Sequence, residues 1–460
     1  MAEMDPGAAI PSDEGDLTAA RFATVLAAVE AADAAAVAAA LEPLHPADIA
    51  DLLEQISATD RRALLALYGR EIDGEVLSEL DEAIREEVIE ALPREVLAEA
   101  VRELDTDDVV DILEDLEQSE QDFILEALES DDRAAVQSSM AWPEYSAGRL
   151  MQSETVAVPQ DWTVGQAIDF LRAAEELPDQ FYHVLLVDVR HRPVGYCTLG
   201  RVLASRRDIA LTEIAEDSFR TIEAGEEESE VAHLFNKYHL ISMPVVDGAG
   251  RLVGVITIDD AMNVLDDEHE EDVLRMAGVH DEAALSDSVF ATIKGRLPWL
   301  AVNLVTALAA SSVVALFADT ISALVALAVL MPVVASMGGN AGTQTMAVTV
   351  RALATRELTP ANALRIIRRE FAVGALNGVV MGSGTALVAT LWFGLPLLGL
   401  VIGLAMLGTL TVAALGGIVI PMLLNRLKID PALASGPFVT TVTDVVGFFA
   451  FLGLASVLLL

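Results

Sequence analysis

The sequence predicts a mainly α-helical membrane protein with a large soluble N-terminal part. Three observations support this fold class. Charge is confined to one part of the chain, long apolar runs fill the other part, and the apolar spacing changes along the soluble part. A net charge of -43 rarely accompanies 53% hydrophobic residues in one globular domain, so the chain is best explained as two parts joined end to end.

The charge changes sharply near residue 291. Residues 291–460 hold five acids and nine Lys/Arg, which leaves 66 acids and 19 bases for residues 1–290. A surface this acidic favours a cation partner and excludes a nucleic-acid partner, which needs a basic footprint. The single Cys197 excludes a disulfide framework and a Cys-based metal cluster. The acidic N-terminus has no apolar signal sequence, so the soluble part is expected in the cytoplasm.

The soluble part begins with a helical pattern. Residues 1–16 are polar and predict a disordered tail, whereas apolar residues recur at three- and four-residue steps over 17–140. Within this helical N-domain, residues 45–54 and 105–114 repeat a similar pattern. Short helices that repeat in this way stack on one another, so a superhelical array is expected.

The pattern changes to short strands near Met151. The order strand, helix, strand, strand occurs twice, and the first hairpin lies at 191–198. The first copy is expected to have strands at 155–158 and 182–187 and a helix at 163–171. The second is expected to have strands at 218–222, 243–247 and 251–257 and a helix at 228–238. The two copies, 141–208 and 209–265, resemble a tandem pair of CBS domains.

A connecting segment, 259–290, follows the second copy. One helix is expected from residue 259 to about 285, and residues 266–272 include six carboxylates. Like charges one helical turn apart destabilise a helix by about 0.2–0.5 kcal/mol per pair, so bridging divalent cations would relieve this segment.

The transmembrane domain, 291–460, is expected to contain five spans. Each is near or above the roughly 20 apolar residues that cross a bilayer, and glycines at 338–342 interrupt the second. The spans are placed at 297–318, 321–350, 371–393, 397–424 and 437–460. Two of the four loops carry all the loop bases, namely Arg351, Arg356, Arg365, Arg368, Arg369, Arg426 and Lys428. Basic loops face the cytoplasm, which puts the N-terminus inside and the C-terminus outside.

Asp444 is the most informative residue of the apolar part, because no other acid and no base lies deep in a span. A carboxylate there costs about 2.5–3.5 kcal/mol, which leaves a cation, water, or a protonated acid bonded to a nearby threonine. We favour the cation over a polar helix contact. One acid per chain is sparse for a divalent ion, and two chains about a two-fold axis would supply two. Mg²⁺, which keeps much of its water shell, suits such a site.

A second polar feature lies in the second span. Gly338, Gly339 and the glycine at 342 expose carbonyls or allow close packing, and Asn340 and Gln344 share a helix face. Packing explains the glycines alone, whereas a pore lining also explains the polar side chains.

The motifs at 332–344 (Pro-Val-Val-Ala-Ser-Met-Gly-Gly-Asn-Ala-Gly-Thr-Gln), 351–356 (Arg-Ala-Leu-Ala-Thr-Arg) and 430–437 (Asp-Pro-Ala-Leu-Ala-Ser-Gly-Pro) resemble the MgtE family of magnesium channels. The resemblance covers the whole chain after the tail. It implies a homodimer that imports Mg²⁺ across the cell's inner membrane. It also implies that Asp444 holds the ion, that Asn340 lies near the cytoplasmic constriction, and that the connecting helix is a plug closed by cytosolic Mg²⁺.

The same resemblance implies regulatory Mg²⁺ ligands on the cytosolic side. Asp107 and Asp111 lie one turn apart and could face the connecting helix. The implied ligands are Glu75, Asp107, Asp111, Asp260, Glu268, Glu271, Asp272 and Asp430.

Some positions depart from the family pattern. His239 and Asn263 stand where acids are usual, and Gly436 stands where Asn precedes proline. Gly200 and Arg201 replace an Arg-Asp pair that helps to hold ATP in relatives. Only Tyr182 remains of that nucleotide pocket, so ATP stays open as a cofactor with Tyr182 as its candidate contact, beside Mg²⁺ in the pore and at the regulatory sites.

Other functions fit less well. An anion transporter would present bases or helix N-termini to the pathway, and a membrane sensor that transports nothing leaves Asp444 without a role. A coupled carrier of Mg²⁺ or Co²⁺ with the same architecture stays open as the alternative to a channel. No phosphate loop, nucleophile elbow or HExxH motif is present, so an enzyme is not expected.

Overall fold

The computed structural model of the chain describes residues 17–460 apart from 115, 175–176, 179–180, 217 and 280–288. The predicted tail at 1–16 and the stretch 280–288 of the connecting segment lie outside these residues. The chain divides into two compact units, Met1–Leu265 and Asp266–Leu460. Each unit has a hydrophobic core of its own.

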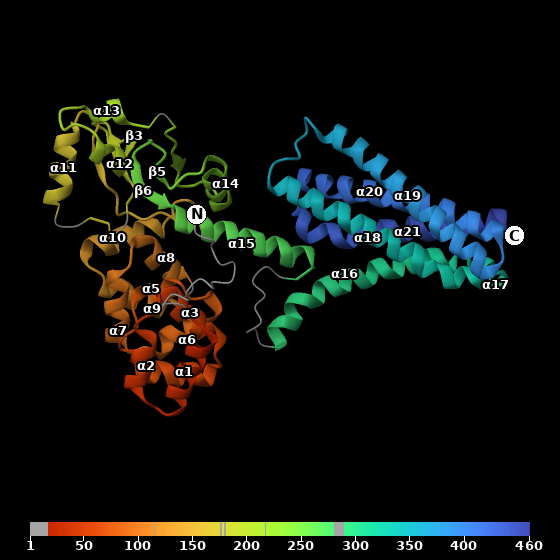
Figure 1. The fold of residues 1–460 in the computed structure, drawn as a ribbon, viewed down its shortest axis with the longest axis horizontal. Helices are drawn as coiled ribbons and strands as arrows, with labels where there is room; N and C mark the ends of the chain where they lie inside the picture. Colours follow the sequence, from red (N-terminus) through yellow and green to blue (C-terminus); the bar gives the residue numbers. More distant parts are fainter. Residues whose placement is uncertain (1–16, 115, 175–176, 179–180, 217, 280–288) are drawn as a thin grey trace, which may run out of the picture. The chain divides into compact units, whose positions relative to one another are not determined.

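The first unit begins with a stack of short helices, drawn in red to orange in Figure 1. Leu52, Leu64 and Ile112 are fully buried in its core. Side-chain caps fix several starts, because Asp33 and Ser57 each accept a hydrogen bond from a backbone N–H of the first turn. The elements are α1 (Ala19–Glu30), α2 (Ala34–Leu41), α3 (Pro46–Gln55), α4 (Ala58–Tyr68), α5 (Gly74–Ser78), α6 (Glu82–Ala91), α7 (Arg94–Ala100), η1 (Val101–Glu103), α8 (Thr106–Glu114), α9 (Gln118–Ala127) and α10 (Ser130–Ser139).

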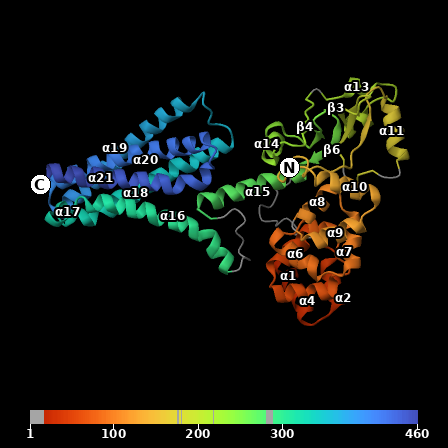
Figure 2. The ribbon, with the colours of Figure 1, turned by 180° about the vertical axis from the view of Figure 1, so that it is seen from behind.

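Helices α3 and α8 correspond to the two similar stretches in the sequence, so both are helical as predicted. Figure 2 shows this stack from behind. The all-helical prediction for this part of the chain is confirmed over the described residues.

Two α/β copies follow, each with a three-stranded sheet of the same order. The first strand of each sheet is parallel to the second, which is antiparallel to the third. The first copy contains β1 (Ala157–Pro159), α11 (Val164–Ala173), β2 (His183–Val187), β3 (Pro193–Thr198), α12 (Leu199–Ala204) and α13 (Leu211–Ile214). The second contains β4 (Ile222–Glu223), α14 (Glu228–Tyr238), β5 (Ser242–Val246) and β6 (Leu252–Thr257).

The predicted strand at 218–222 is too long. Only Ile222 and Glu223 pair with β5, so the stretch before them is not a strand. The segment before β1 also reaches the second copy, because Gln152 bridges to Val255 and Met151 packs into the second copy's core.

Helix α15 (Ile258–Met276) ends earlier than the predicted residue near 285. Gly278 adopts φ +73°, the left-handed conformation that glycine tolerates. The N–H of Val279 donates to Leu274 O at 3.0 Å and the N–H of Gly278 donates to Arg275 O at 3.0 Å. This pair of hydrogen bonds is a Schellman motif, which ends the helix.

The second unit has five helices that are long and apolar enough to cross a membrane. They are α16 (Val289–Ala315), α18 (Ala326–Ala354), α19 (Ala363–Phe393), α20 (Pro396–Arg426) and α21 (Pro431–Leu458). The predicted second span at 321–350 starts too early, because α17 (Ala318–Ala323) is a separate short helix. The glycines at 338–342 do not interrupt α18, which is continuous because its i to i-4 backbone pattern needs no side chain there.

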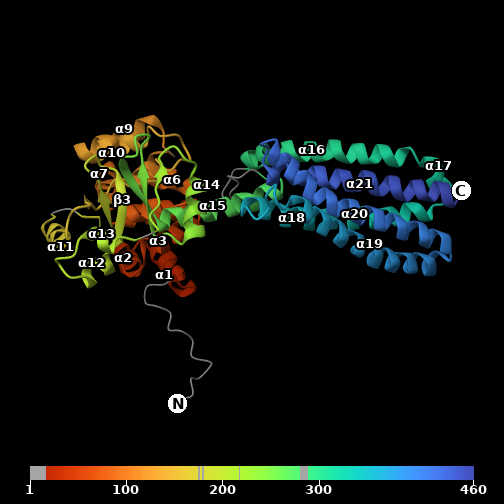
Figure 3. The ribbon, with the colours of Figure 1, turned by 90° about the horizontal axis from the view of Figure 1, so that it is seen from above.

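Helix α20 is the centre of this bundle. In its apolar stretch, 56% of the residues are buried inside the membrane unit, more than in any of the other four long apolar helices. Glycines let its neighbours approach, since a Cβ added at Gly382 of α19 would lie 2.7 Å from the carbonyl oxygen of Gly403. Figure 3 shows α18, α20 and α21 running side by side. This packing holds α21, which carries Asp444.

Candidate ion-binding sites

Asp444 lies midway along α21 and is half-buried within the single chain. Its neighbour Thr443 is fully buried and packs against Gly338 and Gly342 of α18. Because successive helix residues are offset by about 100°, Asp444 lies at the edge of that contact. Among the described residues, no hydrogen bond or ion pair reaches its carboxylate. A charge in this position calls for water, a cation or a second chain.

The run of Gly338, Gly339 and Asn340 on α18 divides between two faces of the helix. A Cβ at Gly338 would lie 2.7 Å from Cγ2 of Thr409 and 3.4 Å from Cβ of Thr443, so this glycine permits close packing. At Gly339, a Cβ would meet nothing within 4 Å. Asn340 and Gln344 are exposed in the single chain. The structure therefore brings Gly338 to Thr443 and leaves Asn340 on an open face.

Thr409 of α20 was not predicted as a site residue. It is fully buried, and its Oγ1 has no hydrogen-bond partner among the described residues. A Cβ at Gly447 would lie 3.4 Å from this oxygen. Thr409 thus adds a buried hydroxyl where α18, α20 and α21 meet. It faces Gly447 of α21, which is about one helical turn from Asp444. A single Thr in an apolar helix gives no sequence signal for such a role.

A carboxylate cluster in the first unit brings Asp107 of α8 to Asp260 of α15. Asp107 is buried, and the carboxylate of Asp260 accepts a hydrogen bond from Thr257 Oγ1 at 2.7 Å. Burial, together with the neighbouring charges, raises the pKa of Asp107 well above its usual value and that of Asp260 to about 6. Asp108, which the sequence analysis missed, joins them, and burial raises its pKa to about 7. The acidic run at 105–108 could have indicated it.

Hydrogen bonds fix the start of α8. Thr106 Oγ1 donates to Glu154 Oε1 at 2.5 Å, and Gln152 Nε2 donates to Asp105 Oδ2 at 3.1 Å. The backbone that carries Asp107 is therefore tied to the segment before β1. Such second contacts orient the groups of an ion site.

The other two predicted ligands of the N-domain lie apart from this pair. Asp111 is bound to Arg85 by an ion pair of 2.7 Å. Glu75 is exposed in the first turn of α5, and its carboxylate has no ion pair in the described ranges.

A second acidic group lies in the second unit. Glu271 pairs with Arg275 at 2.8 Å, and Arg275 is 3.5 Å from Asp430. Burial first, and neighbouring carboxylates second, raise the pKa values of Glu268 and Asp272. Arg275 was not predicted, although its spacing of four from Glu271 is the usual ion-pair spacing.

Neither acidic group is a complete protein cage for a metal. Across the residues that the structure describes, no group of three or more His, Cys, Asp or Glu side chains is arranged to hold an ion. Mg²⁺ is usually bound by one or two carboxylates and keeps several waters, so the paired acids fit it better than a dehydrated metal.

The departures from the family pattern lie on the surface or at helix ends. His239 is exposed and ends α14 in the left-handed conformation, with φ 55°. Asn263 is exposed on α15. A Cβ at Gly436 would lie 4.0 Å from the carbonyl oxygen of Met276.

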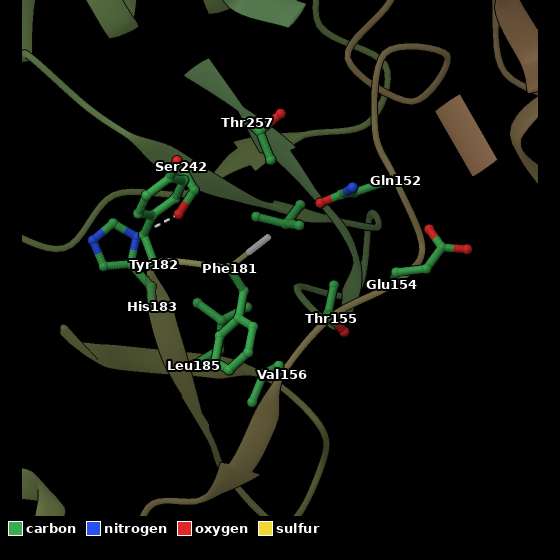
Figure 4. Close-up of a pocket in the computed structure, with 11 residues that line it drawn as sticks. Gln152, Glu154, Thr155, Val156, Phe181, Tyr182, His183, Leu185, Ser242 and Thr257 are labelled. Atoms are coloured by element: carbon green, nitrogen blue, oxygen red, sulfur yellow. Dashed lines mark hydrogen bonds between the residues drawn. The ribbon is translucent and has the colours of Figure 1, made fainter. Parts of the chain in front are cut away.

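The cleft between the two α/β copies contains Tyr182 (Figure 4). His183 of β2 contacts Ser242 of β5 through a short hydrogen bond, and burial lowers the pKa of the histidine. The cavity is about 20 Å³, which is room for roughly one water molecule. Its lining includes the acid Glu154.

The helical array, the paired α/β copies and the five long apolar helices together define a multi-pass membrane protein with a large N-terminal unit outside the spans. Three family models match the chain. The MgtE divalent cation transporter model matches residues 331–454, the MgtE intracellular N domain model matches 44–145, and the CBS domain model matches 211–267.

Curated relatives support the same assignment. "Magnesium transporter MgtE" of Bacillus subtilis is 32% identical over 71% of this chain and 72% of its own length. Its namesake in Thermus thermophilus is 34% identical over 71% of this chain and 73% of its own length. The chain belongs to the MgtE family of divalent cation transporters. It is therefore a transporter by family and not an enzyme, in agreement with the sequence analysis.

Solved structures are similar to the soluble part. The cytosolic domain of the Mg²⁺ channel MgtE in complex with ATP is 30% identical, with a TM-score of 0.49, over 53% of this chain and 99% of that chain. The soluble part of a magnesium transporter is 22% identical, with a TM-score of 0.47, over 54% of this chain and 98% of that chain.

Proposed function

We propose that this protein is a Mg²⁺ channel that imports magnesium across the cell membrane. The observation that carries the proposal is Asp444, a carboxylate midway along an apolar helix and without a protein partner among the described residues. An acid in such a place needs a cation or water. The curated relatives are named magnesium transporters, which favours Mg²⁺ as that cation.

The pore is proposed to lie on the two-fold axis of a homodimer. One half-buried Asp444 per chain gives two carboxylates at one level, which suits a largely hydrated Mg²⁺. The exposed Asn340 on α18 would add a neutral ligand to the same pathway. Gly338 would contribute by close packing and Gly339 by an open backbone face.

The basic loops are proposed to face the cytoplasm, with the N-terminus inside and the C-terminus outside. Cytosolic Mg²⁺ would then reach both acidic groups. Binding between Asp107 and Asp260, and near Glu268, Asp272 and Asp430, would neutralise carboxylates whose raised pKa values reflect burial and crowding. We propose that this neutralisation closes the channel. Glu271 would bind Mg²⁺ within the second group, and Glu75 and Asp111 would be further ligands of the N-domain, apart from the pair of Asp107 and Asp260.

The test is Mg²⁺ flux into liposomes that contain the full-length protein. Asp444→Asn keeps the shape of the side chain and removes its charge, and it should reduce flux at least tenfold. Asp319→Asn is the control, because Asp319 lies in the short helix α17 between two spans. Flux through Asp444→Asn equal to wild type would refute the pore assignment.

Oligomeric state and gating have separate readouts. Mass measurement in lipid nanodiscs should give two chains per particle, and a single chain would remove the symmetric pore. Millimolar Mg²⁺ on the cytosolic face should lower flux and protect the connecting helix α15 from protease. Flux that is indifferent to that Mg²⁺ would remove the gating proposal and leave transport intact.

A further inference from the structure

A cavity of about 390 Å³ lies at the end of the membrane unit where α18 is followed by α19. Residues of α18, of the connection at 357–362, of the first turns of α19 and of α20 line it. Its volume is within the range of about 300–1,000 Å³ that is usual for small-molecule sites. Figure 1 shows α19 diverging from the other helices of the membrane unit at its N-terminal end.

The lining contains charges of both signs. Arg365 and Arg369 stand one turn apart on α19, and Glu357 and Glu370 line the same cavity. Within the described part of the chain, none of these four side chains forms an ion pair. Two guanidinium groups and two carboxylates that do not neutralise one another suit a ligand with both an anionic and a cationic group.

The turn that carries Glu357 is fixed in place. Asn362 Nδ2 donates to the carbonyl oxygen of Glu357 at 2.7 Å, and Asn362 Oδ1 accepts from the N–H of Thr359 at 2.9 Å. This turn is therefore fixed before a ligand binds, which reduces the entropy that its ordering would cost.

The charged residues of the cavity precede the long apolar stretch of α19, where lipid headgroups are expected to begin. The apolar stretch of α19 starts at Phe371, so Arg369 precedes it by roughly 3 Å and Arg365 by roughly 9 Å along the helix axis. The headgroup layer on each side of a bilayer is roughly 5–8 Å deep. Val348, Leu364 and Phe371 are exposed at 69%, 60% and 50%, which offers apolar surface to acyl chains beside the cavity.

We propose that this cavity binds the headgroup of an aminophospholipid. Its phosphate would be held by Arg365 and Arg369, whose planar donors match phosphate oxygens. Its primary ammonium would be held by Glu357 and Glu370. Basic pockets between membrane helices are known headgroup sites, and the two carboxylates here select a zwitterion over a purely anionic lipid. The site requires neither Asp444 nor Mg²⁺.

The test is native mass spectrometry of the full-length protein with added phosphatidylethanolamine, phosphatidylglycerol or phosphatidylcholine of identical acyl chains. Wild type should retain phosphatidylethanolamine best, because its amine is primary. Replacing both arginines (Arg365→Gln with Arg369→Gln) should weaken retention of all three lipids on the order of tenfold. Replacing both acids (Glu357→Gln with Glu370→Gln) should remove only the preference for phosphatidylethanolamine.

Arg368→Gln is the matched control, because Arg368 is on the same turn but does not line the cavity. It should retain lipid as wild type does. Ala352→Phe fills the cavity and keeps every charge, so it should lose the lipid too, and it replaces the double variants if either elutes as an aggregate. Equal retention of phosphatidylglycerol by wild type, equal loss in Arg368→Gln, or full retention by Ala352→Phe would each overturn the proposal.

Discussion

Replacing Gly338 with alanine tests whether this glycine acts through packing at the Asp444 site. The new Cβ would lie 2.7 Å from Cγ2 of Thr409, a β-branched and fully buried side chain with little freedom to move. Overpacking of this kind costs about 1–3 kcal/mol. Alanine regains up to about 1 kcal/mol through its higher helix propensity, so the net loss is expected to be about 0–2 kcal/mol.

Gly339→Ala is the matched control, since its Cβ would meet nothing within 4 Å. That variant has only the helix-propensity gain of about 1 kcal/mol. The two substitutions add the same methyl group to adjacent residues, so their difference of about 1–3 kcal/mol isolates the contact with Thr409. The assay is the apparent melting temperature of full-length protein in one detergent, together with Mg²⁺ flux. If Gly338→Ala melts at or above the temperature of Gly339→Ala, the packing assignment is refuted.

Three further outcomes are expected. Arg85→Ala should lower the stability of the full chain by about 1–3 kcal/mol in thermal unfolding, because buried Arg85 also donates a hydrogen bond to Leu80 O at 2.9 Å. Asp111→Ala should lower it by less than about 1 kcal/mol, because Asp111, the partner of Arg85 in the ion pair, is exposed. The Mg²⁺ concentration that protects the protein from protease should fall as pH rises from 5.5 to 7.5. Asp260 and Asp108, with pKa values of about 6 and about 7, lose protons in this range that compete with the metal. A protecting Mg²⁺ concentration that does not change with pH would exclude these two groups as ligands. The same raised pKa values mean that, without Mg²⁺, the first unit loses stability as pH rises through this window, which urea unfolding can measure.

Local patterns in the sequence were enough to predict most helices and strands of both units. The five apolar helices, α3 and α8 follow from spacing and length alone, and α14 was predicted with its bounds. The end of α15 was missed although the signal was present, because Gly278 follows the last helical turn and glycine is the usual residue there. The errors at 218–222 and near 321 concern where a strand or helix begins. Such boundaries depend on which backbone groups find hydrogen-bond partners, and composition does not show this.

The sites depended on contacts that spacing does not contain. Asp107 and Asp260 are far apart in sequence. The segment before β1 links them in the fold, because Gln152 bonds both to Asp105 beside α8 and to Val255 of β6. The family resemblance had indicated both residues but not Asp108, whose raised pKa arises from burial. Thr409 owes its position to glycines on two other helices. Tertiary packing, which no single-sequence pattern records, determines each of these.

Arg275 gives the acidic group of the second unit an internal counter-charge. Its guanidinium lies 2.8 Å from Glu271 and 3.5 Å from Asp430, so it repels any divalent cation that binds the same carboxylates. At an effective dielectric constant near 20, a unit charge roughly 6 Å from a divalent ion changes its energy by several kcal/mol, and exposure and salt reduce this to about 1 kcal/mol.

Arg275→Ala should therefore lower the Mg²⁺ concentration at the midpoint of channel closure by about fivefold. Arg275→Lys keeps the charge and should retain the wild-type midpoint, which separates electrostatics from loss of the Arg275 contacts. The measurement is Mg²⁺ flux as a function of cytosolic Mg²⁺. A midpoint that rises in Arg275→Ala would mean that the guanidinium holds the acidic group in its closed arrangement, and that this role outweighs its repulsion of the ion.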